Sequence, residues 1–121
     1  MDFDNFFLPA DNLEAAKKFY QDTLGLPVKF DFSQKGMVAF KVANQEPAII
    51  IQDKEKFPDA KPSILFVVED VLLSYRELQA RGVKFLSEPY EIFTGLAVQF
   101  EDPSGNRLGL TDYSKQHRRV Q

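Results

Sequence analysis

Cysteine and tryptophan are absent from the sequence, and histidine occurs once, as His117. Without cysteine there can be no disulfide, no thiolate metal ligand and no cysteine nucleophile. A Ser-His-Asp arrangement would have to use His117, which follows the last predicted strand. Two carboxylate pairs, Glu69-Asp70 and Glu101-Asp102, lie where helix caps and turns need hydrogen-bond acceptors. The sequence therefore predicts no catalytic residue.

A strong charge and a long apolar run are also missing. Fifteen basic and eighteen acidic residues give a net charge of −3, which does not suit a phosphate backbone. No apolar run approaches the ~18 residues that a membrane span needs, and the first ten residues do not resemble a signal peptide. We expect a soluble cytoplasmic protein with no nucleic-acid or membrane partner. The basic cluster near the C-terminus is predicted to be a solvated tail and consists of Lys115, His117, Arg118 and Arg119.

The first half of the chain predicts the order β-α-β-β-β. Pro9 is expected to end the pairing of the first strand because it has no amide to donate. Asp11 and Glu14 form a capping-box-like pair at the start of a helix, and Gly25 fits the position after its end. Alternating apolar residues and turn residues predict strands at residues 3–8, 28–33, 37–42 and 48–53.

The same order repeats after a charged segment, residues 54–62, which carries two prolines and is predicted to be a linker. Asp70 can cap the second helix and Gly82 can end it. We therefore expect a single domain made of a first βαβββ unit (1–53), the linker (54–62), a second unit (63–113) and a tail (114–121). The strands of the second unit are predicted at residues 63–68, 84–90, 96–101 and 107–112.

The most specific motif is FEDPSGNRLGLTDY at residues 100–113, which predicts a strand, a turn containing Asp102, Pro103 and Gly105, and a second strand. It resembles the closing hairpin of the vicinal oxygen chelate superfamily, which includes glyoxalase I, bleomycin-resistance proteins and extradiol dioxygenases. Residues 11–28 resemble the first helix of that family. The resemblance implies an α+β fold of two βαβββ units that form a curved, open mixed β-barrel with the helices outside. A ferredoxin-like sandwich fits less well, because it has two strands per unit where four are predicted here.

The resemblance also implies four metal-ligand positions, one each in the first, fourth, fifth and eighth strands. They fall at Asn5, at Gln52 (or Ile51 if the register of the fourth strand slips), at Ser63 and at Gly109. None carries the imidazole or carboxylate that divalent metals of this family need. We therefore expect a metal-free branch of the family, with no cofactor and without metal-dependent glyoxalase or dioxygenase activity.

The cleft of such a barrel would be lined by apolar, amide and hydroxyl groups, as small-molecule sites commonly are. Gly109 is expected to leave empty the space that a glutamate fills in the family's enzymes. The favoured function is binding of a small aromatic or amphipathic molecule in this cleft. The protein is expected to be a homodimer, with the cleft formed within one chain or across two. The alternative functions are a metal-free lyase, isomerase or other enzyme, and a structural or regulatory dimer with a vestigial cleft. The side chains that line the cleft could instead simply fill a narrow barrel as part of its core. The predicted ligand-binding residues are Asn5, Phe7, Gln52, Ser63, Leu65, Gln99, Arg107 and Gly109.

Overall fold

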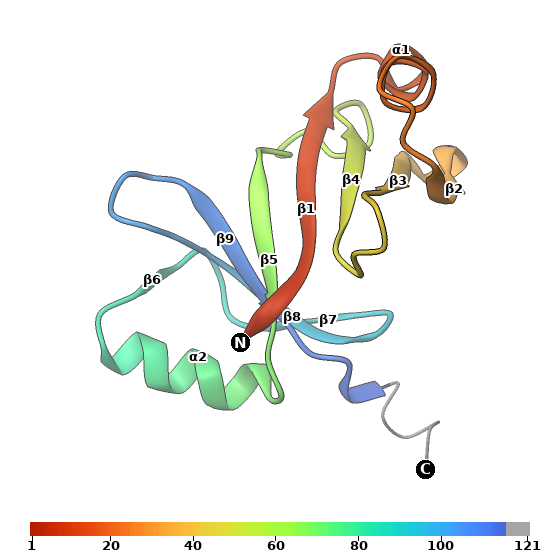
Figure 1. Ribbon diagram of the computed structural model, residues 1–121. Coiled ribbons are helices and arrows are strands. Elements are labelled where there is room, and N and C mark those ends of the chain that lie inside the picture. Colours follow the sequence, from red (N-terminus) through yellow and green to blue (C-terminus); the bar gives the residue numbers. More distant parts are fainter. Residues whose placement is uncertain (116–121) are drawn as a thin grey trace. The chain divides into compact units, whose positions relative to one another are not determined.

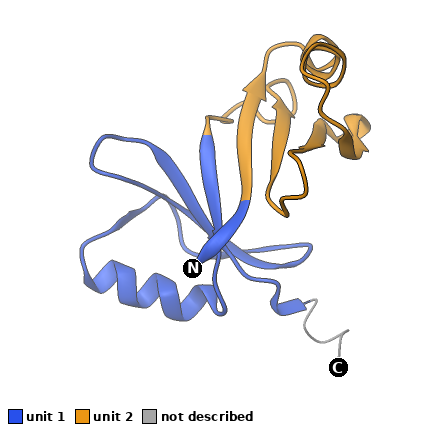
Figure 2. Ribbon diagram, viewed as in Figure 1, with its two compact units in different colours: residues 1–4, 63–121 blue, residues 5–62 orange. Residues whose placement is uncertain are grey.

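The computed structural model describes residues 1–115, so His117, Arg118 and Arg119 of the predicted tail lie outside the described residues. The chain divides into two compact units (Figure 2). The N-terminal unit comprises residues 5–62, and the C-terminal unit comprises residues 1–4 and 63–121.

The N-terminal unit contains a four-stranded sheet in the order β2-β3-β4-β1 (Figure 1). Strand β1 runs parallel to β4, and the β2/β3 and β3/β4 pairs are antiparallel. The helix α1 continues into a π-helical turn, η1, and a 3-10 turn, η2, links β2 to β3. The bounds are β1 (Asp2–Ala10), α1 (Leu13–Lys18), η1 (Phe19–Thr23), β2 (Val28–Phe32), η2 (Ser33–Lys35), β3 (Met37–Lys41) and β4 (Ala48–Asp53).

Two predictions about the start of this unit are wrong. Pro9 does not end the pairing of β1, because it lies opposite Gln52 in the parallel register and the strand continues to Ala10. In a parallel pair only alternate residues donate to a given neighbour, so a missing amide can be tolerated there. The helix cap is Asn12 and not Asp11: the Asn12 side chain accepts a hydrogen bond from the Ala15 amide (3.0 Å).

The sheet of the N-terminal unit has a different set of apolar residues on each face. On one face α1 contributes Leu13 to a core that includes Phe40 and Ile51, and the ring of Tyr20 from η1 stacks on Phe40 with centroids 5.3 Å apart. The opposite face is called here the N-terminal distal face. It holds the buried residues Ala39, Ala48 and Ile50, against which Phe7, Phe30 and Met37 pack.

The C-terminal unit repeats the same plan with one additional short strand. Its sheet has the order β5-β9-β8-β6, with β7 also paired to β8 and with β5 parallel to β9. The predicted strand at residues 84–90 is wrong, since it is broken into β6 and β7 around Pro89, which cannot donate to a ladder. The bounds are β5 (Ser63–Val67), α2 (Val71–Ala80), β6 (Lys84–Phe85), β7 (Tyr90–Ile92), β8 (Gly95–Glu101) and β9 (Arg107–Thr111).

The cap of α2 and the closing hairpin agree with the prediction. The Asp70 side chain accepts a hydrogen bond from the Leu73 amide (3.1 Å). Asp102 accepts hydrogen bonds from the Ser104 and Asn106 amides and from Asn106 Nδ2, each at 2.9 Å. The Asn106 side chain and these amides lower the pKa of Asp102. Of the two carboxylate pairs, Asp70 and Asp102 therefore perform the capping role, whereas Glu101 is the last residue of β8.

One face of the C-terminal sheet packs on α2, with a core built around Val71, Val98 and Leu110. The face opposite α2 is called here the C-terminal distal face. The predicted α+β class, with two βαβββ-type units, is confirmed. Within residues 1–115, no helix is long and apolar enough to cross a membrane.

Candidate functional site

Three of the predicted ligand-binding residues share the N-terminal distal face. Asn5 lies opposite Ala48 and Phe7 lies opposite Ile50 in the β1/β4 register, and Gln52 is two residues beyond Ile50 on the same side of the strand. Ile51 belongs instead to the core beneath α1. The register of the fourth strand therefore places Gln52, and not Ile51, on the same face as Asn5 and Phe7.

The Asn5 side chain has a structural task on this face. Its Oδ1 accepts a hydrogen bond from the Ala48 amide (2.9 Å) and so joins the side chain of β1 to the backbone of β4. This oxygen is thereby engaged within the unit. A ligand on this face would meet the apolar surface of Phe7 and the amide of Gln52 more readily than the oxygen of Asn5.

Sequence reasoning missed an aromatic pair on the same face. Phe30 and Phe32 of β2 have ring centroids 4.8 Å apart at an interplanar angle of 35°. Phe32 is 52% exposed and lies opposite Met37, while Phe30 lies opposite Ala39. The period of two along residues 28–33 could have identified this pair, since Phe30 and Phe32 must share one face.

The other five predicted residues share the C-terminal distal face, on three neighbouring strands. Leu65 of β5 and Gln99 of β8 both lie opposite Gly109 of β9, one from each side. Ser63 lies opposite Arg107 in the β5/β9 register. The structure thus brings together a leucine, an amide, a hydroxyl and a guanidinium around a central glycine.

The space above Gly109 is not empty, so that expectation is wrong. A Cβ atom at this position would lie 2.6 Å from Leu65 Cδ1 and 3.3 Å from the Val98 carbonyl oxygen. The side chain of Leu65 has taken the room that the missing side chain leaves, as close-packed protein interiors require. A ligand on this face would contact Leu65 rather than enter a cavity over Gly109.

Tyr90 is a further polar residue on the C-terminal distal face that sequence reasoning missed. It lies opposite Ala97, which is two residues from Gln99 along β8 and so shares its face. Burial raises the pKa of the Tyr90 phenol, and the nearby Arg107 guanidinium offsets only part of this effect. Tyr90 therefore keeps its proton at neutral pH and can donate a hydrogen bond. The sequence did not indicate that Tyr90 lies on this face, because residues 84–90 were predicted to form one strand.

The four positions at which the family's metal ligands were expected do not fit a divalent metal. Gly109 has no donor, and Asn5 Oδ1 already accepts from the Ala48 amide. Gln52 and Ser63 offer only a neutral amide and a hydroxyl, whereas zinc and related metals are held by imidazole, thiolate or carboxylate groups. In the described part of the chain, no three His, Asp or Glu side chains come together as a possible metal site.

We predict that purified untagged protein contains well below one equivalent of zinc, nickel, iron or manganese. Chelator should leave its melting temperature unchanged, because no metal contributes free energy to folding. Elemental analysis and thermal melts with and without chelator test this. A stoichiometric metal whose removal lowers the melting temperature would show that other residues form a metal site.

The chain is similar to a known protein family and to several known proteins. The family described as Glyoxalase/Bleomycin resistance protein/Dioxygenase superfamily matches residues 2–110. The uncharacterized protein YetH of Bacillus subtilis (strain 168) is 28% identical over 102 residues, which cover 79% of this chain and 85% of YetH. The uncharacterized protein YurT of the same organism is 27% identical over 111 residues, which cover 80% of this chain and 87% of YurT.

Two solved structures share the fold at low sequence identity. Methylmalonyl-CoA epimerase from Mycobacterium tuberculosis aligns with a TM-score of 0.73 at 17% identity and covers 98% of this chain and 91% of its own. The hypothetical protein BH1468 from Bacillus halodurans C-125 aligns with a TM-score of 0.72 at 15% identity and covers 92% and 93% respectively. At such identities the likeness establishes the fold and no activity.

Proposed function

Because the chain belongs to the glyoxalase/bleomycin resistance protein/dioxygenase superfamily, we propose that it is a metal-free member that binds a small aromatic or amphipathic molecule. The observation that carries the proposal is the composition of the C-terminal distal face. Leu65 offers an apolar surface there, and Gln99 and Tyr90 offer an amide and a protonated phenol. Small-molecule sites commonly combine an apolar lining with a few such polar groups.

Each residue of this face has a proposed role. Leu65 packs against the apolar part of the ligand, while Ser63 and Gln99 fix its orientation by hydrogen bonds. Arg107 and Tyr90 favour a ligand with a carboxylate or phenolate, since both can donate to an anionic oxygen. On the N-terminal distal face, Phe7, Phe30 and Phe32 supply stacking surface, and Asn5 and Gln52 supply amides.

A metal-free enzyme is the second candidate, and one observation favours it. Glu101 lies opposite Arg107 in the β8/β9 register, so the alternation of β8 places a carboxylate on the C-terminal distal face. Such a group could act as a general base. Incubating the protein with its ligand and following the ligand by mass spectrometry distinguishes the two functions: an unchanged ligand indicates binding alone, and turnover that Glu101→Gln abolishes indicates the enzyme.

We predict a large thermal shift with a cognate ligand. At one hundred times the dissociation constant, binding should stabilise the folded protein by roughly 2.7 kcal/mol. For a chain of 121 residues this corresponds to a rise in melting temperature of about 10 °C. A plate screen of uncharged and weakly anionic aromatic metabolites and antibiotics measures it.

Gly109→Glu locates the site of any hit from that screen. The new side chain must displace Leu65 and would add a charge to the C-terminal distal face, so the thermal shift should disappear. The matched control is Leu73→Glu, because Leu73 lies on α2 and is 55% exposed. Each variant is compared with its own unliganded form. If Gly109→Glu keeps the full thermal shift, the ligand does not bind on the C-terminal distal face.

We also propose that the protein is a cytoplasmic homodimer. The C-terminal unit exposes Phe3 (55%), Leu86 (45%) and Phe93 (82%), and a partner subunit could cover such apolar side chains. Light scattering should give twice the chain mass of 13.9 kDa, or about 28 kDa. A mass of one chain at micromolar concentration would contradict the dimer. A dimer that shows no ligand shift would instead favour the structural or regulatory alternative.

A further inference from the structure

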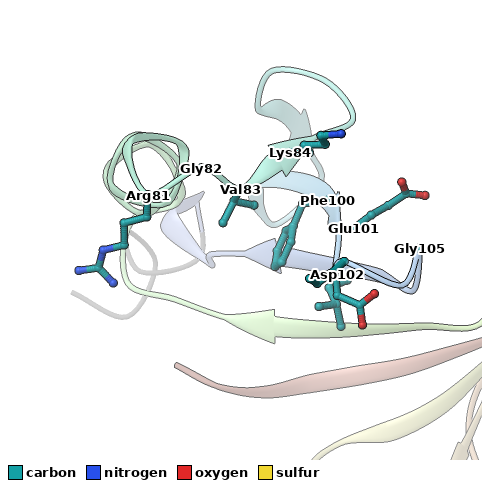
Figure 3. Close-up of a pocket in the computed structure, with 10 residues that line it drawn as sticks. Arg81, Gly82, Val83, Lys84, Phe100, Glu101, Asp102 and Gly105 are labelled. Atoms are coloured by element: carbon teal, nitrogen blue, oxygen red, sulfur yellow. The ribbon is translucent and has the colours of Figure 1, made fainter.

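The C-terminal unit has a cavity of about 600 Å³ next to the end of α2 (Figure 3). Phe100 and Leu108 contribute to its wall and lie opposite each other in the β8/β9 register. They alternate with Gln99 and Gly109, so their side chains lie on the α2 side of the sheet and not on the distal face. The lining residues are Arg81, Gly82, Val83, Lys84, Phe100, Glu101, Asp102, Pro103, Gly105 and Leu108.

The cavity exists because the hairpin extends beyond the helix. The core under α2 is centred on Val71, Val98 and Leu110, and the helix ends at Ala80. Phe100 is two residues further toward the turn than Val98. Two glycines border the hollow: a Cβ atom at Gly82 or at Gly105 would meet no heavy atom within 4 Å.

A row of aromatic rings leads to this cavity. Tyr75 and Phe85 have ring centroids 4.7 Å apart at 64°, and Phe85 and Phe100 have centroids 5.4 Å apart at 58°. Phe100 is the member of the row that lines the cavity. A further ring placed there would continue a series of edge and tilted contacts of the kind that aromatic groups prefer.

The charges around the cavity balance. Arg81 and Lys84 are cationic, and Glu101 and Asp102 are anionic. Lys84 lies opposite Glu101 in the β6/β8 register, and both oxygens of Asp102 accept hydrogen bonds within the turn. Figure 3 shows the Arg81 guanidinium directed away from Phe100. The charged residues around the cavity therefore have no net charge that would attract an ionic ligand. Such a ligand would lose hydration on entering, without compensation.

We propose that this cavity is a second binding site, which takes a small uncharged aromatic molecule. The ring of the ligand packs on Phe100, Leu108 and Val83, and Pro103 closes the side toward the turn. The volume lies within the range of roughly 300–1,000 Å³ that small-molecule sites occupy. The site is separate from the proposed ligand-binding site, because Leu65, Gln99 and Tyr90 do not line it. Of the residues given a role on the distal faces, only Glu101 at the end of β8 also borders this cavity.

Benzyl alcohol is the probe for this site, with benzoate and benzylammonium as charged analogues of similar size. Titration into methyl-labelled protein at neutral pH should give saturable shifts of the Val83 and Leu108 methyl signals, with a dissociation constant in the millimolar range expected for so small a ligand. The charged analogues should bind at least about fivefold more weakly. Equal affinity for all three probes, or the absence of a saturable shift, would overturn the proposal.

Two variants and a matched control locate the probe. Val83→Phe fills the cavity and should weaken benzyl alcohol binding at least about tenfold. Val42→Phe makes the same change in the N-terminal unit, where Val42 is 37% exposed, and should leave the affinity unchanged. Phe100→Leu keeps an apolar wall but removes the last ring of the row, and should weaken binding severalfold. The second site would be contradicted if both Val83→Phe and Phe100→Leu kept the wild-type affinity for benzyl alcohol. It would also be contradicted if the chemical shift changes were confined to the Leu65 and Ile50 methyl groups. Neither result would contradict the ligand site proposed on the distal faces.

Discussion

Replacing Gly95 with alanine should lower the free energy of unfolding by about 4 kcal/mol and the melting temperature by about 15 °C. Gly95 is the first residue of β8 and is buried. A Cβ atom there would lie 2.4 Å from Asp112 Oδ1, 2.5 Å from the Asp112 carbonyl oxygen and 2.9 Å from the Ser114 amide nitrogen. Two of these atoms belong to the backbone, so no rotation of a side chain can relieve the contact.

Gly82→Ala is the matched control for this substitution. Gly82 has φ +95°, so alanine there is strained, but its Cβ would meet no heavy atom within 4 Å. The cost should be only about 1 kcal/mol, the usual penalty for placing a side chain in a left-handed conformation. Chemical denaturation of both variants measures the difference. A Gly95→Ala protein as stable as Gly82→Ala would mean that the Gly95–Asp112 approach is looser than the structure shows.

Asp112→Ala should lower the free energy of unfolding by about 4 kcal/mol, because the buried carboxylate accepts hydrogen bonds from three parts of the C-terminal unit. Its two oxygens accept from the Val71 amide at the start of α2 (2.9 Å), from the Leu96 amide of β8 (3.0 Å) and from the amide and hydroxyl of Ser114. Alanine would leave the Val71 and Leu96 amides without this acceptor. Asp112→Asn should cost less, since an amide oxygen can retain part of the network. Equal stabilities of Asp112→Ala and the wild type would contradict this role.

The same residue makes stability depend on pH. Burial disfavours the charged form of Asp112, but the hydrogen bonds from Leu96, Val71 and Ser114 outweigh it and lower the pKa of Asp112. A carboxyl whose pKa is lower in the folded state stabilises the fold above its unfolded value of about 3.9, and this contribution is lost as the pH falls through the folded value. The difference in free energy of unfolding between the wild type and Asp112→Asn should therefore decrease below about pH 4. A constant difference down to pH 2 would show that Asp112 is not held ionised.

Much of the fold follows from local sequence. The turn that contains Asp102 and Gly105 and the cap at Asp70 were predicted because their chemistry acts over three or four residues. The α1 cap was misplaced by one residue because Asp11 and Asn12 are both good caps. Asp11 instead has its side chain at the surface, where its Oδ1 pairs with Lys54 Nζ at 3.1 Å.

The errors at longer range have a common physical origin. Whether Pro9 interrupts β1 depends on the partner strand, and whether Gly109 leaves a space depends on Leu65, which is distant in the sequence. The role of Asp112 likewise depends on Val71. Alternation along a strand assigned seven of the eight predicted ligand-binding residues to faces, and the family resemblance added Gln52. Neither could say which neighbouring side chains would fill those faces.

The most direct test of the proposed function is the position of a bound ligand on the wild-type protein. Intermolecular nuclear Overhauser effects should be measured between the aromatic protons of a thermal-shift hit and the methyl groups of the protein. We predict contacts to Leu65 and Ala97 on the C-terminal distal face, and none to Val98 or Leu110 in the core under α2. For a hit with a carboxylate or phenolate, which the cavity beside α2 should disfavour, contacts confined to methyl groups on the α2 side, with none to Leu65, would contradict the proposed function.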